Sequence, residues 1–332
     1  MHEFSVLAGK DIVELLDGRE RDVIGWVEDA YLAHDAKHTV NPDSYFLRFP
    51  DKPDARIIAL PAFLGGEDDV AGIKWISSFP ANTRSGLPRA SAVLVLNDYS
   101  TGYPFALLES AGISAARTAA SAALAATVLG AADARTVGVV GAGVIARTIC
   151  RYLAAAEIPL TDMVCHDLDD DSARALAGHL AEEHGADSRT GSLEDALGAD
   201  LVVLATTVLH PYIGTEHRLR AGQVVLNVSL RDLEPQLLLT ARNVVDDVDH
   251  CLKANTSPHL AEQLLGNRSF IDGTLADVLR GRAAPDPERP VIFSPFGLGV
   301  LDLAVGHRLF RQAREEGRLL DVPGFFGETR RW

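Results

Sequence analysis

The hydrophobic pattern of the first third of the chain predicts one helix followed by several strands. In residues 11–38 apolar side chains such as Val23 and Val27 recur at three- and four-residue spacing, and Asn41-Pro42 ends the helix. Strands are predicted at five runs rich in β-branched and aromatic residues: 45–49, 55–61, 70–79, 90–96 and 104–108. Because short turns separate these runs, an antiparallel sheet is predicted.

The pattern changes at residue 136, where apolar strands begin to alternate with helices. Residues 113–129 form a predicted helix of small side chains that stops at Gly130. Further strands are predicted at 136–140, 163–166, 201–206, 224–228, 244–245 and 291–293. Such alternation is typical of a parallel sheet covered on both faces. The predicted fold is therefore α/β: a Rossmann-type doubly wound parallel sheet domain, plus an α+β domain with an antiparallel sheet.

A glycine turn links the first of these strands to its helix. Gly141, Gly143 and Ala146 have the spacing G-x-G-x-x-A, and Val144 and Ile145 open the helix. The first glycine permits a tight turn, the second lets backbone N–H groups approach a pyrophosphate, and the alanine lets helix and strand pack closely. The anion then lies at the positive end of the helix. The turn predicts a bound dinucleotide.

The next strand predicts which dinucleotide. Asp167 ends that strand, where an acid bonds the ribose hydroxyls of NAD. No arginine follows it, and the nearby acids would repel a 2′-phosphate, so NAD is favoured over NADP. Asp169, Asp170 and Asp171 are assigned only to a helix N-terminus, which the helix dipole favours. Thr206, at the end of a later strand, is a further candidate for cofactor contact.

Composition limits the classes of partner. The chain has 332 residues, enough for two domains, and 46 acidic against 31 basic side chains, a formal net charge of -15. No basic cluster suits nucleic acid, and no apolar run is long enough for a membrane span. The three cysteines, Cys150, Cys165 and Cys251, have the spacing of reduced core thiols. A cytoplasmic protein is expected. The histidines and acids have no metal-ligand spacing, so no metal is predicted.

Four charged residues stand out as candidates for the chemistry. Lys74 lies in an apolar run, where a charge is costly unless it is paired or functional. Arg117 lies near the start of a helix, where a cation needs an anionic partner. Asp232 follows the strand at 224–228, at the edge where open α/β sheets bind ligands. Arg48 lies in a strand, where a solvated arginine is nearly as plausible as a functional one.

An ordered set of motifs along most of the chain resembles the ornithine cyclodeaminase and mu-crystallin family. The set comprises Gly72-Ile73-Lys74-Trp75, Gly86-Leu87-Pro88, Asn97-Asp98, Thr101-Gly102-Tyr103-Pro104, Arg117-Thr118-Ala119-Ala120-Ser121, Gly141-Ala142-Gly143, Asn227 with Asp232, and Gly297-Leu298-Gly299 with Asp302. The resemblance implies that Lys74, Arg117 and Arg48 bind substrate carboxylates and that Asp232 is the general acid/base. It also implies NAD contacts at Thr118 and Ser229, and a homodimer.

Within that family, several segments are similar to the N-(2-amino-2-carboxyethyl)-L-glutamate dehydrogenases of 2,3-diaminopropionate biosynthesis, which serve siderophore and peptide-antibiotic pathways. They are Lys74-Trp75-Ile76-Ser77-Ser78-Phe79-Pro80, Arg89-Ala90-Ser91-Ala92, Ser229-Leu230-Arg231-Asp232-Leu233 and Phe325-Phe326-Gly327. This likeness implies an NAD-dependent oxidation of a secondary amine that carries three carboxylates. Such a substrate would suit a pocket lined by Lys74, Arg117 and Arg48, with Arg89 or Arg231 in reserve.

Two departures argue against ornithine cyclisation. Ile58-Ala59-Leu60-Pro61 stands where the cyclodeaminases have Glu-Leu-Met-Pro, and Leu233-Glu234-Pro235 stands where they have Pro-Gly-Lys. Ornithine cyclodeaminase or a related imine reductase stays an alternative, as does a non-catalytic ligand-binding protein of the mu-crystallin type. The expected domains are 1–116 with 306–332 for substrate binding and dimerisation, and 117–305 for NAD. Because Lys74 and Arg117 come before the glycine turn in the chain, the site is expected to form between the two domains.

Overall fold

The computed structural model describes residues 3–283 and 286–327, which form two compact units. The N-terminal unit comprises Met1–Arg117 and Leu298–Trp332, and the central unit comprises Thr118–Gly297. The sequence predicted that the chain returns to the N-terminal unit between residues 305 and 306, whereas in the structure this boundary lies between Gly297 and Leu298. The boundary comes earlier because one continuous helix of the N-terminal unit starts at Gly299. The predicted domain ranges also include residues 1–2, 284–285 and 328–332, which lie outside the described residues.

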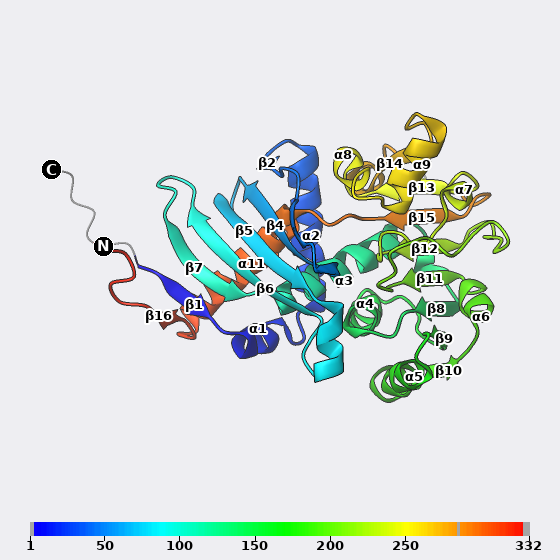
Figure 1. Ribbon diagram of the computed structural model, residues 1–332, viewed down its shortest axis with the longest axis horizontal. Helices are drawn as coiled ribbons and strands as arrows, with labels where there is room; N and C mark the ends of the chain where they lie inside the picture. Colours follow the sequence, from blue (N-terminus) through cyan, green and yellow to red (C-terminus); the bar gives the residue numbers. More distant parts are fainter. Residues whose placement is uncertain (1–2, 284–285, 328–332) are drawn as a thin grey trace. The chain divides into compact units, whose positions relative to one another are not determined.

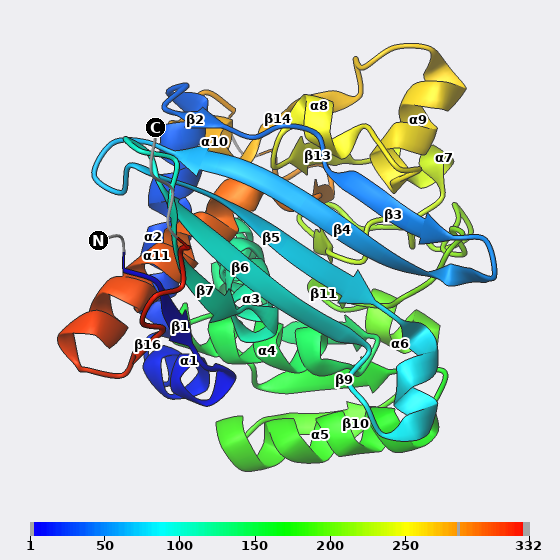
Figure 2. The same cartoon turned by 60° about the vertical axis from the view of Figure 1, so that its left-hand side comes forward.

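The N-terminal unit is built on one mixed sheet. Its elements are β1 (Ser5–Leu7), α1 (Gly9–Leu16), α2 (Glu20–Asp35), β2 (Thr39–Val40), β3 (Tyr45–Phe49), β4 (Lys52–Leu64), β5 (Val70–Ser78), η1 (Pro80–Ser85), β6 (Ala90–Asp98), β7 (Pro104–Glu109), the start of α3 (Ala111–Val128), α11 (Gly299–Glu315) and β16 (Leu320–Asp321). The described strands follow the order β16-β1-β7-β6-β5-β4-β2, with β3 also paired to β4. From β3 to β7 each pair is antiparallel, as predicted, and Figure 2 shows β4, β5 and β6 side by side.

Helix α11 packs closely on this sheet. A Cβ on Gly72 of β5 would lie 2.3 Å from the Val95 carbonyl oxygen and 2.8 Å from a methyl of Leu303. Leu94 and Leu96 alternate with less buried residues along β6 and are fully buried. The alternation follows from the two-residue period of a strand with one face on the core.

One prediction for the N-terminal unit is wrong. The single helix at 11–38 is in fact two helices, α1 and α2, because Gly18 between them adopts a φ of 72° that ends the first helix. At the other end of the chain, the Phe325 ring stacks on Phe4 of the same unit with 3.8 Å between ring centroids.

The central unit contains a parallel sheet. Its elements are the rest of α3, η2 (Ala131–Asp133), β8 (Thr136–Val140), α4 (Val144–Ala155), β9 (Asp162–His166), α5 (Asp170–His184), β10 (Asp187–Thr190), α6 (Leu193–Leu197), β11 (Leu201–Leu204), β12 (Val224–Asn227), α7 (Pro235–Leu238), β13 (Arg242–Val245), α8 (Val248–Cys251), α9 (Ser257–Leu265), β14 (Ile271–Thr274), α10 (Leu275–Leu279) and β15 (Val291–Ser294). The described strands have the order β10-β9-β8-β11-β12-β15-β13-β14, and every pair is parallel.

This strand order is that of a Rossmann-type doubly wound sheet. From β8 the chain steps outward to β9 and β10, then returns to the other side of β8 with β11 and β12. Figure 1 shows α4 and α6 on opposite sides of the strands. All residues of β11, β12, β13 and β15 are buried, as expected for a sheet covered on both faces. The predicted α/β fold class is confirmed.

The pattern missed the two edge strands, β10 and β14. Their sequences, Asp-Ser-Arg-Thr and Ile-Asp-Gly-Thr, are short and mostly polar, because an edge strand is covered on one side only. The three cysteines are free and buried, as expected for core thiols. In the described part of the chain, no helix is both long and apolar enough to cross a membrane.

Gly138 of β8 permits a close approach that a side chain would prevent. A Cβ at this position would lie 1.9 Å from the carbonyl oxygen of Ala196 in α6. We predict that Gly138→Ala lowers the free energy of unfolding by about 1–3 kcal/mol, because the helix must move off the sheet. Urea unfolding followed by circular dichroism measures the change. Gly178→Ala, in α5 with open space around the added methyl group, is the control and should be neutral or stabilising. Equal stabilities of Gly138→Ala and the parent protein would contradict the prediction.

Candidate functional site

The glycine turn of the central unit has the geometry that a dinucleotide turn needs. Gly141 has a φ of 91°, and a Cβ there would lie 2.7 Å from the Ala205 carbonyl oxygen, so only glycine fits. The Gly141 N–H donates to the carbonyl of His166, which ties the turn to the end of β9. Ala146 is fully buried and lets α4 lie against the sheet.

Asp167 holds this turn from the neighbouring strand. Its Oδ2 accepts from the backbone N–H of Ala142 at 2.7 Å, and its Oδ1 accepts from the N–H of Asp169 at 2.9 Å. Asp169 is in turn the N-cap of α5, which confirms that the acids at 169–171 mark a helix start. The carboxylate of Asp167 is therefore fixed beside the glycine turn.

The start of α4 offers donors to an anion. Gly143 is the N-cap of α4 and provides no side-chain cap, so the first helical N–H groups have no side-chain acceptor from this residue. A Cβ on Gly143 would meet only open space within 4 Å, the space a pyrophosphate would take up. Val144, beside it, is 63% exposed. Gly141, Gly143, Val144, Ile145 and Asp167 thus lie together, and the arrangement fits NAD.

Asp232 lies in a second polar cluster of the same unit. Thr206 donates its hydroxyl to Oδ1 of Asp232 at 2.5 Å, and the Ser229 hydroxyl donates to Oδ2. The carboxylate is fully buried. Burial raises the pKa of Asp232 above its ordinary value, while the hydrogen bonds from Ser229 and Thr206 and the charge of Arg231 act in the opposite direction. A carboxyl group with a raised pKa, held by two hydroxyls, is suited to accept or return a proton.

The backbone around Asp232 is held firmly on both sides. Its carbonyl oxygen accepts from the N–H groups of Tyr212 and Ile213, both at 3.0 Å. Leu230, two residues before it, has a φ of 78°, which costs a side-chain-bearing residue on the order of 1–3 kcal/mol. The Leu230 carbonyl accepts from the N–H of Ser257 at 2.8 Å, which helps to hold this conformation.

Tyr212 is a candidate that the sequence did not indicate. Its side chain is 37% exposed, and its pKa is raised first by burial and then by the negative charges of Asp232 and Asp167. The phenol therefore lies within electrostatic range of both acids. Nothing in the sequence around Pro211 distinguishes this tyrosine from a loop residue, because the relevant acids are distant in the chain.

The N-terminal unit holds a second candidate cluster, formed by two cations around one carboxylate. Lys74 Nζ lies 2.7 Å from Oδ2 of Asp302, and Arg117 Nε donates to Oδ1 at 3.2 Å. Lys74 also donates to the Ser114 hydroxyl at 3.1 Å. Lys74 and Asp302 are 1% and 0% exposed. The lysine therefore does not extend to water from an edge strand; β5 lies between β4 and β6.

The cluster carries a surplus positive charge. The pKa of Lys74 is lowered to about 8, first by burial and then by the charge of Arg117, whereas Asp302 acts to raise it. With Lys74 protonated, two positive charges face one negative charge. The arrangement can attract a second anion, such as a carboxylate. Asp302 and Ser114 were not predicted as site residues, although Asp302 belongs to the last motif of the family resemblance.

Three other predicted residues have positions that the structure also gives: Arg48, Thr118 and Arg231. Arg48 is exposed on β3, with its guanidinium 5.2 Å from the Phe46 ring centre, and the structure does not bring it into contact with Lys74 or Arg117. Thr118 is half-buried in α3. Arg231 donates to the Ala254 carbonyl at 3.2 Å.

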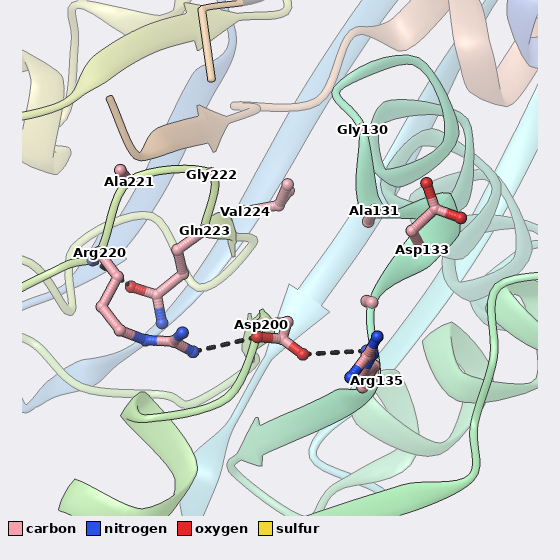
Figure 3. Close-up of a pocket in the computed structure, with 11 residues that line it drawn as sticks. Gly130, Ala131, Asp133, Arg135, Asp200, Arg220, Ala221, Gly222, Gln223 and Val224 are labelled. Atoms are coloured by element: carbon pink, nitrogen blue, oxygen red, sulfur yellow. Dashed lines mark hydrogen bonds and ion pairs between the residues drawn. The ribbon is translucent and has the colours of Figure 1, made fainter. Parts of the chain in front are cut away.

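A cavity of about 290 Å³ lies at the amino ends of β8, β11 and β12, whereas the glycine turn and Asp232 follow the carboxyl ends of their strands (Figure 3). Two of its charged side chains pair with each other: Arg220 donates to Asp200 at 3.1 Å, and the same carboxylate accepts from the backbone N–H of Arg135 at 2.9 Å. This cavity is therefore separate from the candidate site.

Known proteins resemble this chain over nearly its whole length. The model of the ornithine cyclodeaminase/mu-crystallin family matches residues 6–317. The N-((2S)-2-amino-2-carboxyethyl)-L-glutamate dehydrogenase of Staphylococcus aureus is 26% identical over 328 residues, which cover 95% of this chain and 96% of that protein.

Solved structures share the fold. The crystal structure of CmnK has a TM-score of 0.89 at 27% identity and covers 98% of this chain and 100% of its own. The Δ1-pyrroline-2-carboxylate reductase of Thermococcus litoralis, in complex with NADH and L-proline, has a TM-score of 0.88 at 24% identity, covering 96% of this chain and 100% of its own. With the motif set, the glycine turn and a family match that spans both units, the chain belongs to the ornithine cyclodeaminase/mu-crystallin family.

Proposed function

We propose that this protein is an NAD-dependent dehydrogenase of N-(2-amino-2-carboxyethyl)-L-glutamate. The products are 2-oxoglutarate and L-2,3-diaminopropionate, a precursor for siderophore or peptide-antibiotic biosynthesis. The observation that carries the proposal is the buried cluster of Lys74 and Arg117 around Asp302, because its surplus charge calls for a carboxylate-bearing substrate. The likeness to the S. aureus dehydrogenase over nearly the whole chain supports the specific substrate.

The cofactor is assigned to the central unit. Gly141, Gly143, Val144 and Ile145 form the pyrophosphate turn, and Asp167 meets the ribose hydroxyls. The cofactor makes further contacts with Thr118, Thr206 and Ser229. NAD, when bound, supplies the hydride acceptor.

The protein side chains carry the remaining steps. Lys74 and Arg117 bind the carboxylate on the glutamyl Cα, and Arg48 binds another carboxylate. Loss of a hydride from that Cα and of the amine proton leaves a substrate imine. Water adds to the imine carbon, and the C–N bond then breaks to release the amine. Asp232 accepts the proton of the amine or of the attacking water, the role for which its raised pKa is suited.

The sequence-based alternatives act on other substrates or on none. An ornithine cyclodeaminase would need an acid for the side-chain amine, and the corresponding position, Ile58, is an apolar residue of β4. A non-catalytic binding protein would not need the acid Asp232 held by two hydroxyls. The homodimer and the cytoplasmic location stay predictions from the sequence.

A direct assay tests the proposed substrate. Purified protein with NAD and N-(2-amino-2-carboxyethyl)-L-glutamate should form NADH, 2-oxoglutarate and 2,3-diaminopropionate in equal amounts, measured by NADH absorbance and mass spectrometry. L-Ornithine is the comparison substrate. Release of ammonia and proline from ornithine, with no NADH from the first compound, would contradict the proposal.

Replacement of the proposed acid/base tests its role. Asp232→Asn keeps the size of the side chain but removes the proton acceptor, so we expect turnover to fall by about 10²–10⁴-fold while the Kd for NAD is unchanged. Steady-state kinetics and NAD titration measure the two quantities. Asp171→Asn, an exposed acid at the start of α5, is the matched control. Full activity in Asp232→Asn would remove this residue from the mechanism.

The lowered pKa of Lys74 predicts the alkaline limb of the pH profile. Only protonated Lys74 holds a carboxylate, so kcat/KM should fall as pH rises through about 8, where the folded protein loses this proton. In Lys74→Arg the side chain stays positively charged, so the alkaline fall of kcat/KM should move to higher pH. The maximum value of kcat/KM should be lower, because arginine differs from lysine in shape and hydrogen-bonding geometry. The acidic limb, set by Asp232, should be unchanged. Identical alkaline limbs in the two proteins would contradict the assignment.

A further inference from the structure

One face of the N-terminal sheet has cations at two ends with apolar side chains between them. In β5, Lys74, Ile76 and Ser78 alternate onto this face, and residues directly opposite each other in antiparallel strands share a face. Ile58 of β4 lies opposite Ile76, and Arg56 lies opposite Ser78. The Lys74 end carries the Asp302 cluster described above, and the Ser78 end carries further arginines.

Arg89 is the best-defined cation at the Ser78 end. It directly precedes β6, and its Nη1 donates to the Ser78 hydroxyl at 2.8 Å. Ser78 is only 8% exposed, so this hydrogen bond orients the guanidinium over the face that carries Lys74. The register of β3 places Arg48 opposite Arg56 on the same face.

The charge of Arg89 has no carboxylate partner within the described residues. The side chain is half-buried, and burial lowers its pKa, with no neighbouring acid to offset this. Two other arginines of the N-terminal unit are paired with acids: Arg308 lies 3.2 Å from Asp29, and Arg318 lies 2.5 Å from Glu14. In a chain with 46 acidic and 31 basic residues, a half-buried arginine held only by a hydroxyl is available for an external anion.

The spacing of the two ends suits a substrate with two carboxylates. Lys74 and Ser78 are four residues apart on one strand, which separates their Cα atoms by about 13 Å. The side chains of lysine and arginine are long enough to shorten this gap to the reach of an extended dicarboxylic amino acid. Ile58 and Ile76, between the two ends, offer an apolar surface to the methylene groups that join two carboxylates.

We propose that Arg89, oriented by Ser78, binds a second carboxylate of the substrate, remote from the reacting carbon, and so selects for dicarboxylic over monocarboxylic amino acids. This inference rests on the proposed function, because it takes the Lys74 end as the site of the first carboxylate. The remote carboxylate is either the γ-carboxylate of the glutamyl part or the carboxylate of the diaminopropionyl part.

The test pairs a charge-removing variant with substrates that lack one carboxylate. Arg89→Gln should lower kcat/KM for N-(2-amino-2-carboxyethyl)-L-glutamate by about 10–100-fold, the usual range for a lost charge-assisted hydrogen bond. The comparison substrates are the γ-amide, N-(2-amino-2-carboxyethyl)-L-glutamine, and N-(2-aminoethyl)-L-glutamate. For the analogue that lacks the carboxylate bound by Arg89, the variant and the parent protein should differ by less than about threefold. Arg84→Gln, an exposed arginine in the adjacent η1 turn, is the matched control and should behave as the parent protein.

Two further measurements separate recognition from folding. Arg89→Lys should retain part of the activity, and Ser78→Ala should raise KM with little change in kcat, because it only loosens Arg89. Thermal unfolding identifies any variant that is destabilised. An Arg89→Gln defect equal on all three substrates, or no defect at all, would overturn the inference.

Binding of inert ligands keeps this result separate from the fate of the proposed reaction. If the parent protein forms no NADH from the first substrate, the proposed function fails. Titration calorimetry with glutarate and its monoamide still tests Arg89: the parent protein and Arg84→Gln should prefer glutarate by about tenfold or more, and Arg89→Gln should lose this preference. No preference for glutarate in the parent protein would overturn the inference on its own.

Discussion

The N-terminal unit depends on the ion cluster at Asp302. A fully buried carboxylate would be prohibitively costly to desolvate on its own, and the two cations that contact it come from β5 and α3, whereas Asp302 belongs to α11. The cluster therefore joins three elements that are distant in the chain. Loss of Asp302 would leave the buried charge of Lys74 without a counter-ion beside Arg117, which typically costs several kcal/mol. The same arrangement keeps one positive charge in excess, so a single cluster both holds the sheet against its helices and favours an anion.

The central unit also contains a fully buried carboxylate, which is stabilised by hydroxyl groups in place of cations. Asp232 is buried as completely as Asp302, but its carboxylate oxygens accept from Thr206 and Ser229, and the charge of Arg231 is a weaker influence. The hydroxyls satisfy the hydrogen-bonding capacity of the carboxylate without adding a full positive charge. The effect of burial therefore prevails, and the pKa of Asp232 is raised. Asp302, by contrast, contacts two cations directly. The strained backbone at Leu230 lies in the loop that carries Asp232, as expected where function and local preference conflict.

The face of the N-terminal sheet that carries Lys74 and Arg89 is positively charged, although the chain as a whole is acidic. In this chain, with a formal net charge of -15, several arginines pair with carboxylates at the surface, such as Arg268 with Asp249 and Glu262, and such pairs contribute little to stability. Arg89, by contrast, is held by the Ser78 hydroxyl beside an apolar strip. A local positive field in a negative protein directs anionic ligands to one place, because like charges elsewhere repel them.

Features that are local in the chain could be predicted from the sequence alone. The glycine turn, Asp167 and the helix start at Asp169 lie within one strand–helix–strand segment, so their spacing alone predicted the geometry that the structure has. The alternation of apolar runs likewise predicted the parallel sheet. It did not predict the edge strands β10 and β14, because these are mostly polar and bury too few apolar side chains to show a pattern. The helix at 11–38 was wrong because one glycine outweighed an otherwise continuous periodicity.

The contacts between buried polar groups could not be predicted in this way. Asp302 lies 185 residues from Arg117, and Thr206 lies 26 residues from Asp232, and no local pattern links either pair. Lys74 could be singled out from its apolar surroundings, but its partner could not, because a buried charge can be compensated by any acid that packing brings within reach. The family resemblance pointed to the same positions without giving their contacts. Chain-local spacing determines turns and strands, whereas the partners of buried charges depend on how distant segments pack.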